Sequence, residues 1–160
     1  MIKIRILALG KLKEKYLREA VSEYEKRLSA FCSFEIIELE PVKLSDKPSP
    51  SEISAALGRE ADMLLSKIPQ GALTVALCIE GKMLSSEELS KTVGEAAING
   101  YSNIVFIIGS SYGLSDRIKN AANIKLSVSK MTFPHQLFRV MLCEQIYRAF
   151  KILQGGTYHK

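Results

Sequence analysis

The feature that most constrains the fold of this chain is a regular alternation of short β-rich runs with helical patterns along its 160 residues. We expect strands at Ile2 to Leu9, Phe34 to Leu39, Leu73 to Ile79, Ile104 to Ile108 and Ile124 to Val128. Their continuous apolar runs, such as VALCI and IVFII, are typical of strands covered on both faces, as in a parallel sheet. The alternation therefore predicts an α/β fold, a three-layer α/β/α sandwich around a mostly parallel sheet.

The segments between these strands carry recognisable helix starts. An amphipathic helix is expected over Lys13 to Leu28, with its apolar residues on one stripe. Ser49 and Ser85 each precede a glutamate by three residues, which is the spacing of a capping box, so a helix should follow each serine. A shorter helix is expected at Asp116 to Ala122. The loop Pro41 to Pro50 is too short to separate domains and predicts a surface excursion.

Composition and length favour one domain over residues 1–160. The chain is 47% apolar, enough for a sizeable core. It has no apolar run near the roughly 20 residues that span a bilayer, and no signal-peptide pattern at its start. The three cysteines, Cys32, Cys78 and Cys143, lie far apart among apolar neighbours and lack zinc-site spacing. We therefore expect reduced core thiols, no metal, no membrane association and a cytoplasmic location.

Positive charge gathers in the last part of the chain. From Arg117 onward there are eight Lys or Arg and one acid, Glu144, a balance of +7, whereas residues 1–116 balance at −2; together these give the net +5. Clustered cations favour a polyanionic partner that approaches one surface. A basic helix face that is merely solvated would give the same count.

Candidate chemistry lies at three strand ends. These are Leu77 to Lys82, Ile108 to Gly113 and Val128 to Phe133. Parallel sheets bind ligands beyond the carboxyl ends of their strands, so the shared position matters more than any single motif. Gly109 and Gly113 would let backbone approach a ligand, although an ordinary tight turn explains them equally well. The pattern is neither a dinucleotide-binding loop nor a P-loop.

The helix that opens at Pro134 is apolar around nearly its whole circumference. Such a helix should be buried on every side, within the fold or against another subunit. A homodimer is the simpler explanation for so short a chain, and a central core helix of a monomer is the alternative. The residues concerned are Leu137, Phe138, Val140, Met141, Leu142, Ile146, Tyr147, Ala149, Phe150, Ile152 and Leu153.

A few polar residues in and after this helix are candidate functional groups. Arg139 has no acid three or four residues away, so its charge is expected to be free for an external anion such as phosphate. Glu144 and Arg148 have the spacing of a helical ion pair. His135 falls in the first turn, where the positive end of the helix dipole disfavours a protonated ring. His159 lies in a terminal tail, Thr157 to Lys160, that is either fitted to a partner or frayed.

Several runs together resemble a known family. They are SKMTFPHQLFRVMLCEQIYRAFKILQGGTYHK, LALGKLKEKYLREAVSEYEKRL, EGKMLSSEEL and IGSSYGL. These are similar to the small bacterial 23S ribosomal RNA pseudouridine N3-methyltransferases of the SPOUT, or trefoil-knot, superfamily, and the likeness covers essentially the whole chain. The resemblance implies a homodimer, a deep C-terminal trefoil knot and S-adenosylmethionine bound in that knot. It also implies methylation of N3 of a pseudouridine on the assembled ribosome.

The resemblance also assigns roles to residues by their matching motifs. It implies catalytic or base-orienting roles for His135, Arg139, Tyr158 and His159, and RNA contacts for Arg139, His159 and Lys160. In such enzymes the tail of one subunit is thought to complete the site of the other. Which histidine would accept a proton stays open. The positions implied to hold the cofactor are Leu77, Gly109, Val128, Ser129, Lys130, Met131, Thr132 and Phe133.

Two positions depart from the family pattern. Ser110 follows Gly109 where relatives commonly have a second glycine, and Cys78 stands where they often carry an acid. Two other classes of protein remain as alternatives. A nucleotide- or flavin-dependent oxidoreductase would need a phosphate loop after the first strand, where this chain has only Gly10. An RNA-binding assembly factor without catalysis would need no cofactor pocket.

Overall fold

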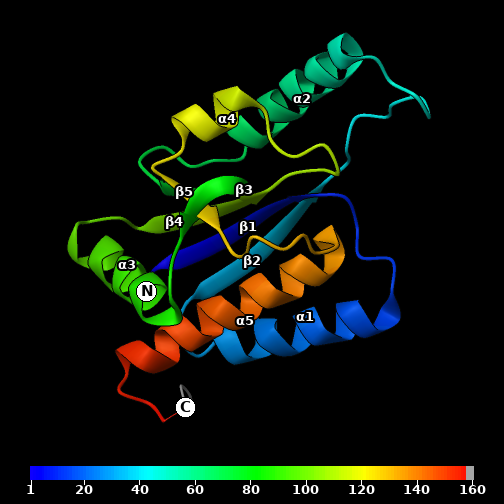
Figure 1. Ribbon diagram of the computed structural model, residues 1–160. Helices are drawn as coiled ribbons and strands as arrows, with labels where there is room; N and C mark the ends of the chain where they lie inside the picture. Colours follow the sequence, from blue (N-terminus) through cyan, green and yellow to red (C-terminus); the bar gives the residue numbers. More distant parts are fainter. Residues whose placement is uncertain (158–160) are drawn as a thin grey trace.

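The computed structural model describes residues 1–157, in which five strands alternate with five helices. Within that range no helix is both long and apolar enough to cross a membrane. The arrangement is drawn in Figure 1. The elements are β1 (Lys3–Leu9), α1 (Lys15–Leu28), β2 (Ser33–Leu39), α2 (Pro50–Leu65), β3 (Leu73–Met83), α3 (Ser86–Ile98), β4 (Asn103–Ile108), α4 (Asp116–Ala121), β5 (Ile124–Ser127) and α5 (His135–Leu153).

The five strands form one sheet in the order β2-β1-β4-β3-β5. Every pair of neighbouring strands is parallel. Helices α2 and α4 cover one face of the sheet, and α1, α3 and α5 cover the other (Figure 1). The α/β fold and its three layers are therefore confirmed. The trefoil knot implied by the resemblance stays a prediction.

The core lies on both faces of the sheet because successive strand residues point to opposite sides. In β1, Ile4 and Ile6 join the cluster under α1, α3 and α5, while Leu7 joins the cluster under α2 and α4. The same alternation places Phe106 of β4 in the first cluster and Ile107 in the second. Two-sided burial explains why the strands are continuous apolar runs in the sequence.

The expected helix starts are confirmed with small shifts. Ser49 and Ser85 both form full capping boxes, in which the serine hydroxyl accepts from the glutamate backbone N–H and the glutamate carboxylate accepts from the serine backbone N–H. Helix α1 begins at Lys15, two residues later than expected, because Glu14 is the extended residue before it. The loop before it is held instead by hydrogen bonds to β2 and α5. Helix α4 ends at Ala121.

Strand β3 runs further than the sequence pattern predicted, to Met83 instead of Ile79. Leu77 and Lys82 both pair with Leu126 of β5, so the four residues between them bulge out of the ladder. The bulge closes tightly at Gly81, where an added Cβ would lie 2.6 to 2.7 Å from backbone atoms of Lys125 and Leu126. A bulge breaks the alternation by which a strand is recognised, which explains the early end of the predicted strand.

Helix α5 is not buried on every side within one subunit, so the alternative expectation, a central core helix of a monomer, is wrong. Its buried residues form one stripe that packs on the sheet and against α1 and α3: Arg139, Leu142, Cys143, Ile146, Ala149 and Phe150. Leu137 and Leu153 are exposed, and Val140 and Met141 are half-buried. The outer side of the helix thus keeps apolar surface. The homodimer, which would cover it, stays a prediction.

Candidate functional site

The three strand ends that the sequence singled out line one pocket of about 360 Å³. Its walls are the bulge after Leu77, the turn after β4 and the segment after β5, with Lys119, His135 and Phe138 completing the lining. Strands β4, β3 and β5 are consecutive in the sheet and parallel, so their carboxyl ends meet at one edge. Sheet order is therefore what joins segments that lie far apart in the sequence.

The turn after β4 is closed by its own backbone. Gly113 donates its N–H to the Ser110 carbonyl at 2.8 Å and adopts φ of +82°, a conformation that favours glycine. Gly109 is packed against this closure, since a Cβ there would overlap the Gly113 carbonyl oxygen and lie 2.5 Å from its carbon. Glycine is thus required at position 109 by a close backbone approach. The tight turn is therefore confirmed, and it forms part of the pocket wall. Approach of its backbone to a ligand stays a prediction.

The segment after β5 is shaped by short-range serine contacts. Ser127 donates its hydroxyl to the Ser129 carbonyl at 3.2 Å, and Ser129 Oγ accepts from the Met131 backbone N–H at 3.0 Å. These contacts between residues two apart form local turns in the segment. Seven of the eight predicted cofactor positions line the pocket: Leu77, Gly109, Val128, Ser129, Met131, Thr132 and Phe133. Lys130 is exposed and is not among the lining residues.

The pocket rim carries an ion pair that sequence analysis missed. Lys119 of α4 contacts Glu80 of the bulge at 2.5 Å. Its hydrogen bond is the main cause of a lowered Glu80 pKa, and the same contact raises the pKa of Lys119. Both groups therefore stay charged near neutral pH. Beside them, burial and the charge of Glu80 raise the pKa of Cys78, which keeps this half-buried thiol in its neutral form.

His135 lies between this pocket and a second one. The second pocket, about 460 Å³, lies against the loop after β1, the loop after β2 and the start of α5. His135 and the residues Ser110 to Tyr112 line both pockets. His135 is exposed and occupies the first position of α5, as expected. A group held in the second pocket would therefore be separated from the first pocket by His135 and by the turn from Ser110 to Tyr112.

The expectation that the charge of Arg139 is free is wrong. Its guanidinium contacts the Glu38 carboxylate of β2 at 2.6 Å and donates to the Gly10 carbonyl at 3.0 Å. The side chain is 4% exposed, although the residue lines the second pocket. The sequence rule failed because it looked for an acid on the same helix, whereas the partner lies 101 residues away on a neighbouring strand.

Sequence analysis also missed Glu60, which is 3% exposed. One carboxylate oxygen accepts from the Ser110 hydroxyl at 3.0 Å, and the other accepts from the Val42 backbone N–H at 3.0 Å. Glu60 thereby joins the turn between the two pockets to the loop after β2. A signal was present, because position 60 lies four residues after Ala56 and four before Leu64 on the buried stripe of α2. Ser110, which departs from the family pattern, thus donates its hydroxyl hydrogen bond to the Glu60 carboxylate.

Two other expectations have different outcomes. Glu144 and Arg148 form the expected ion pair at 2.5 Å, although both side chains are half-buried instead of exposed. Tyr158, His159 and Lys160 lie outside the described residues, so their proposed roles remain predictions. Among residues 1–157 there is no group of three or more His, Cys, Asp or Glu side chains placed to hold a metal ion.

Comparison with known proteins gives full-length matches. A family model described as "Predicted SPOUT methyltransferase" matches residues 2–159. The Ribosomal RNA large subunit methyltransferase H of Streptococcus equi subsp. zooepidemicus is 49% identical over 159 residues, which are 99% of this chain and 100% of that protein. The proteins of the same name from Streptococcus suis and Streptococcus pneumoniae are each 50% identical with the same coverage.

Two solved structures share the fold at low sequence identity. A probable methylase family protein from Haemophilus influenzae matches with a TM-score of 0.55 at 9% identity, over 99% of this chain and 70% of that one. A structure that concerns the 2-OH methylation of C/U34 on tRNA matches with a TM-score of 0.51 at 14% identity, over 96% and 98%. With the family model spanning nearly the whole chain and relatives half identical over their full length, this protein belongs to the SPOUT methyltransferase family.

Proposed function

We propose that this methyltransferase uses S-adenosylmethionine to methylate N3 of a pseudouridine in 23S ribosomal RNA on the assembled ribosome. One observation carries the proposal: three strand ends converge on a single pocket that meets a second pocket at His135. Full-length relatives named as large-subunit ribosomal RNA methyltransferases support the choice of substrate. The bound donor would supply an electrophilic methyl group, so the protein's task is orientation and exclusion of water.

The first pocket fits a donor of this kind. Its volume of about 360 Å³ lies in the range of small-molecule sites, and its lining is apolar with a few polar groups. The Gly109 turn and the backbone of Val128 to Phe133 offer amide and carbonyl groups to an adenosine, and Leu77 and Phe138 offer apolar contact. Glu80 and Lys119 are the charged residues among those that line it.

Transfer to N3 of pseudouridine requires loss of the imide proton, so a proton acceptor or a solvent path must be at hand. His135 is the described residue placed for this role, because its ring borders both pockets. His159 and Tyr158 are proposed to join it from the tail, with Lys160 and His159 on RNA. Arg139 takes part by orienting the loop after β1, since its own charge is already paired with Glu38.

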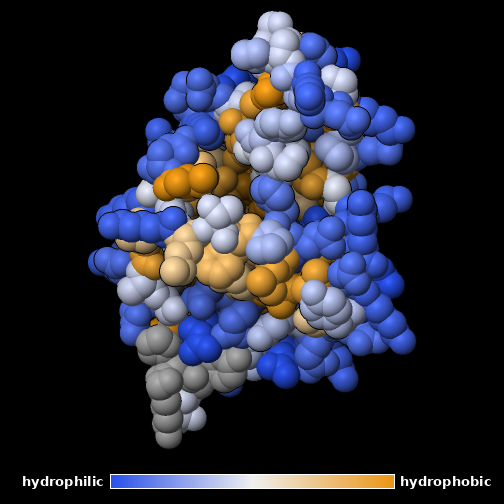
Figure 2. Space-filling model, turned by 45° about the vertical axis from the view of Figure 1, so that its right-hand side comes forward, coloured by the Kyte–Doolittle hydropathy of each residue, from blue (hydrophilic) through white to orange (hydrophobic). Residues whose placement is uncertain are grey.

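We assign the catalytic unit to a homodimer of single-domain chains, in the cytoplasm. Apolar surface beside the site supports the dimer: Ile79 and Met131, which both line the first pocket, are each 77% exposed. Figure 2 shows apolar side chains gathered in a band across the middle of one face, between hydrophilic regions. A second copy covering such a band would remove it from water. Sedimentation equilibrium that returned the mass of one chain would contradict the dimer.

The decisive experiment is methylation of bacterial ribosomes that lack the modification, compared with the isolated 23S RNA. We expect the ribosome to accept a methyl group, identified by mass spectrometry of nucleosides as N3-methylpseudouridine, and the isolated RNA to be a poor substrate. So small a chain must recognise the shape of an assembled surface. Methylation of a different nucleoside, or none on any RNA, would contradict the proposal.

The same assay tests the histidines. His135→Ala and His159→Ala are each expected to slow single-turnover methylation by roughly 100-fold or more if the ring accepts the proton, which is the usual range for general-base catalysis. His135→Gln is the matched variant, because it keeps a hydrogen-bonding side chain without the basic nitrogen. If both alanine variants keep the full single-turnover rate, neither ring is the proton acceptor.

A thiol footprint tests the cofactor pocket without any RNA. Burial raises the pKa of Cys32 and of Cys143 to about 12, so neither should react with iodoacetamide in the folded protein near pH 8. Cys78 is half-buried and lines the pocket. Its reaction should speed up as pH rises past the ordinary thiol value, since its pKa is raised.

S-adenosylmethionine at ten times its dissociation constant is expected to slow Cys78 alkylation about tenfold, by mass action. Peptide mass spectrometry measures the rate at each cysteine separately. Cys78→Ser serves as the control and should leave the folded protein unlabelled. If S-adenosylmethionine leaves the alkylation rate of Cys78 unchanged, the cofactor binds elsewhere.

A further inference from the structure

The loop between β1 and α1, Gly10 to Glu14, forms one wall of the second pocket. Leu9, Gly10, Lys11 and Lys13 all line that pocket. The loop is fixed to the rest of the fold at both ends. Gly10 donates its N–H to the Leu39 carbonyl at 2.8 Å, and Lys13 donates its N–H to the Gln136 side chain of α5 at 3.0 Å. Its shape is therefore set before any ligand arrives.

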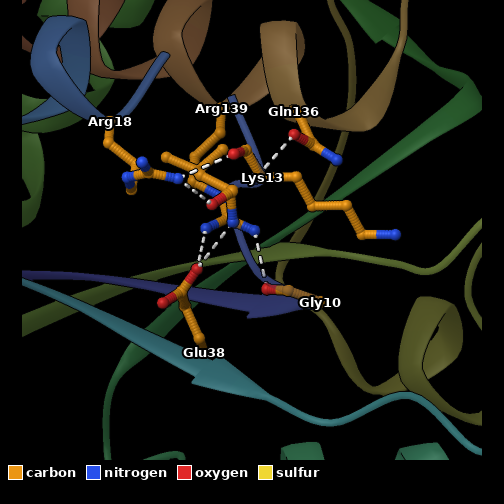
Figure 3. A network of polar contacts seen from close by, with 7 residues as sticks. Gly10, Lys13, Arg18, Glu38, Gln136 and Arg139 are labelled. Atoms are coloured by element: carbon orange, nitrogen blue, oxygen red, sulfur yellow. Dashed lines mark hydrogen bonds and ion pairs between the residues drawn. The ribbon is translucent and has the colours of Figure 1, made fainter. Parts of the chain in front are cut away.

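Two arginines take up the carbonyl groups of this loop. Arg139 holds the Gly10 carbonyl at 3.0 Å, and Arg18 of α1 holds the carbonyls of Leu12 at 3.2 Å and Lys13 at 2.7 Å. Figure 3 shows both guanidinium groups directed at the loop backbone. Glycine at position 10, with φ of +102°, adopts a conformation that a side chain would strain. The negative ends of three peptide dipoles are thus neutralised by hydrogen bonds to cations.

The two lysines of the loop form no ion pair among the described residues. Among residues 1–157, neither the Lys11 nor the Lys13 ammonium group lies within ion-pair distance of a carboxylate. In Figure 3 the Lys13 side chain extends away from the Arg139 and Glu38 pair. Two acids that lie beside the loop and the second pocket already accept hydrogen bonds. Glu38 accepts from Arg139 and from the Leu12 N–H, and both oxygens of Glu60 accept hydrogen bonds.

We infer that this loop is a phosphate-binding element for RNA, in which Lys11 and Lys13 neutralise backbone phosphates that flank a nucleotide seated in the second pocket. The inference rests on the proposed function and adds to it the place where the substrate chain enters. RNA is favoured over a free nucleotide because two mobile lysine charges suit neighbouring phosphates along a strand. A nucleotide at this place would face the first pocket across His135 and Tyr112.

The test is the salt dependence of ribosome binding by Lys11→Gln with Lys13→Gln, measured by sedimentation with bacterial ribosomes between about 0.05 and 0.2 M salt. Loss of two phosphate contacts should lower the slope of log affinity against log salt by about 1.4 to 1.8. At about 0.15 M salt the affinity should fall roughly 15- to 30-fold. Cofactor affinity by calorimetry should stay at the parent value.

Matched variants separate charge at this place from charge in general. Lys26→Gln with Lys91→Gln removes two exposed lysines of α1 and α3 and should leave the salt slope unchanged. Lys11→Arg with Lys13→Arg should restore it. A parent-like slope in the Lys11 and Lys13 glutamine variant, or a parent protein that does not bind ribosomes, would overturn the inference. If the parent binds ribosomes and the glutamine variant shows the expected fall in slope, but the parent transfers no methyl group, only the proposed function is overturned.

Discussion

Gly109→Ala is expected to lower the rate of methyl transfer about 100-fold, the usual effect of displacing a reacting group by 1 Å. The added Cβ would overlap the Gly113 carbonyl, which is backbone and has no alternative rotamer. The turn must open, at a cost of about 1 to 3 kcal/mol for overpacking. This turn lines both pockets, so its opening displaces cofactor and substrate together. Calorimetry with S-adenosylmethionine should show weakened binding alongside the lost activity.

Gly58→Ala is the matched control. Gly58 lies within α2, where an added Cβ would meet no atom within 4 Å and the backbone is ordinary helix. Alanine there should raise the free energy of unfolding by up to about 1 kcal/mol through helix propensity, with activity unchanged. Parent-like cofactor affinity in the Gly109 variant would mean that the turn is not part of the cofactor site.

Glu38→Leu is expected to lower the free energy of unfolding by about 3 to 5 kcal/mol, the cost of leaving a buried charge without its partner. Arg139 is only 4% exposed, and its remaining partner would be the Gly10 carbonyl. Arg139→Met should cost less, about 1 to 2 kcal/mol, because the Glu38 side chain is 38% exposed and water can reach it. Urea unfolding measures both free-energy losses, provided that the slope of free energy against urea concentration is the same in variant and parent.

The double variant is the control for this pair. With both charges gone, no unpaired charge stays buried, so the double variant should be more stable than Glu38→Leu alone. Losses that simply add in the double variant would show that the pair does not act as a unit. Equal losses in the two single variants would contradict the asymmetry expected from their exposures. Because Arg139 also holds the loop after β1, its variant should weaken ribosome binding even where the protein stays folded.

Local patterns predicted the elements of this fold well. The serine and glutamate pairs at Ser49 and Ser85 form the capping boxes that their spacing indicated, because a capping box involves only four consecutive residues. The strand runs are apolar because both sheet faces are buried, so their existence was visible too. The end of β3 was missed, since a bulge at residues 78–81 depends on how β5 pairs with it.

The candidate site, too, could be predicted from the sequence only in part. The three strand ends could be proposed from sequence, because any parallel sheet places ligands there. That they form one pocket depends on β4, β3 and β5 being neighbours, which no local pattern states. The partners of Arg139 and Ser110 also escaped prediction, because Glu38 and Glu60 are distant from them in sequence. The helical stripe could indicate that Glu60 is buried, but not which group it contacts.

The sequence by itself determined the alternation of strands and helices, the helix caps, the apolar core and, through full-length likeness, the family. Those properties depend on side-chain periodicity and on neighbours within one turn of helix or one strand. The tertiary structure decided which strand ends meet, which acids neutralise Arg139 and Lys119, and which lysines of the described chain border the second pocket. Charges act through space, so their pairing is fixed only when the chain has brought distant segments together.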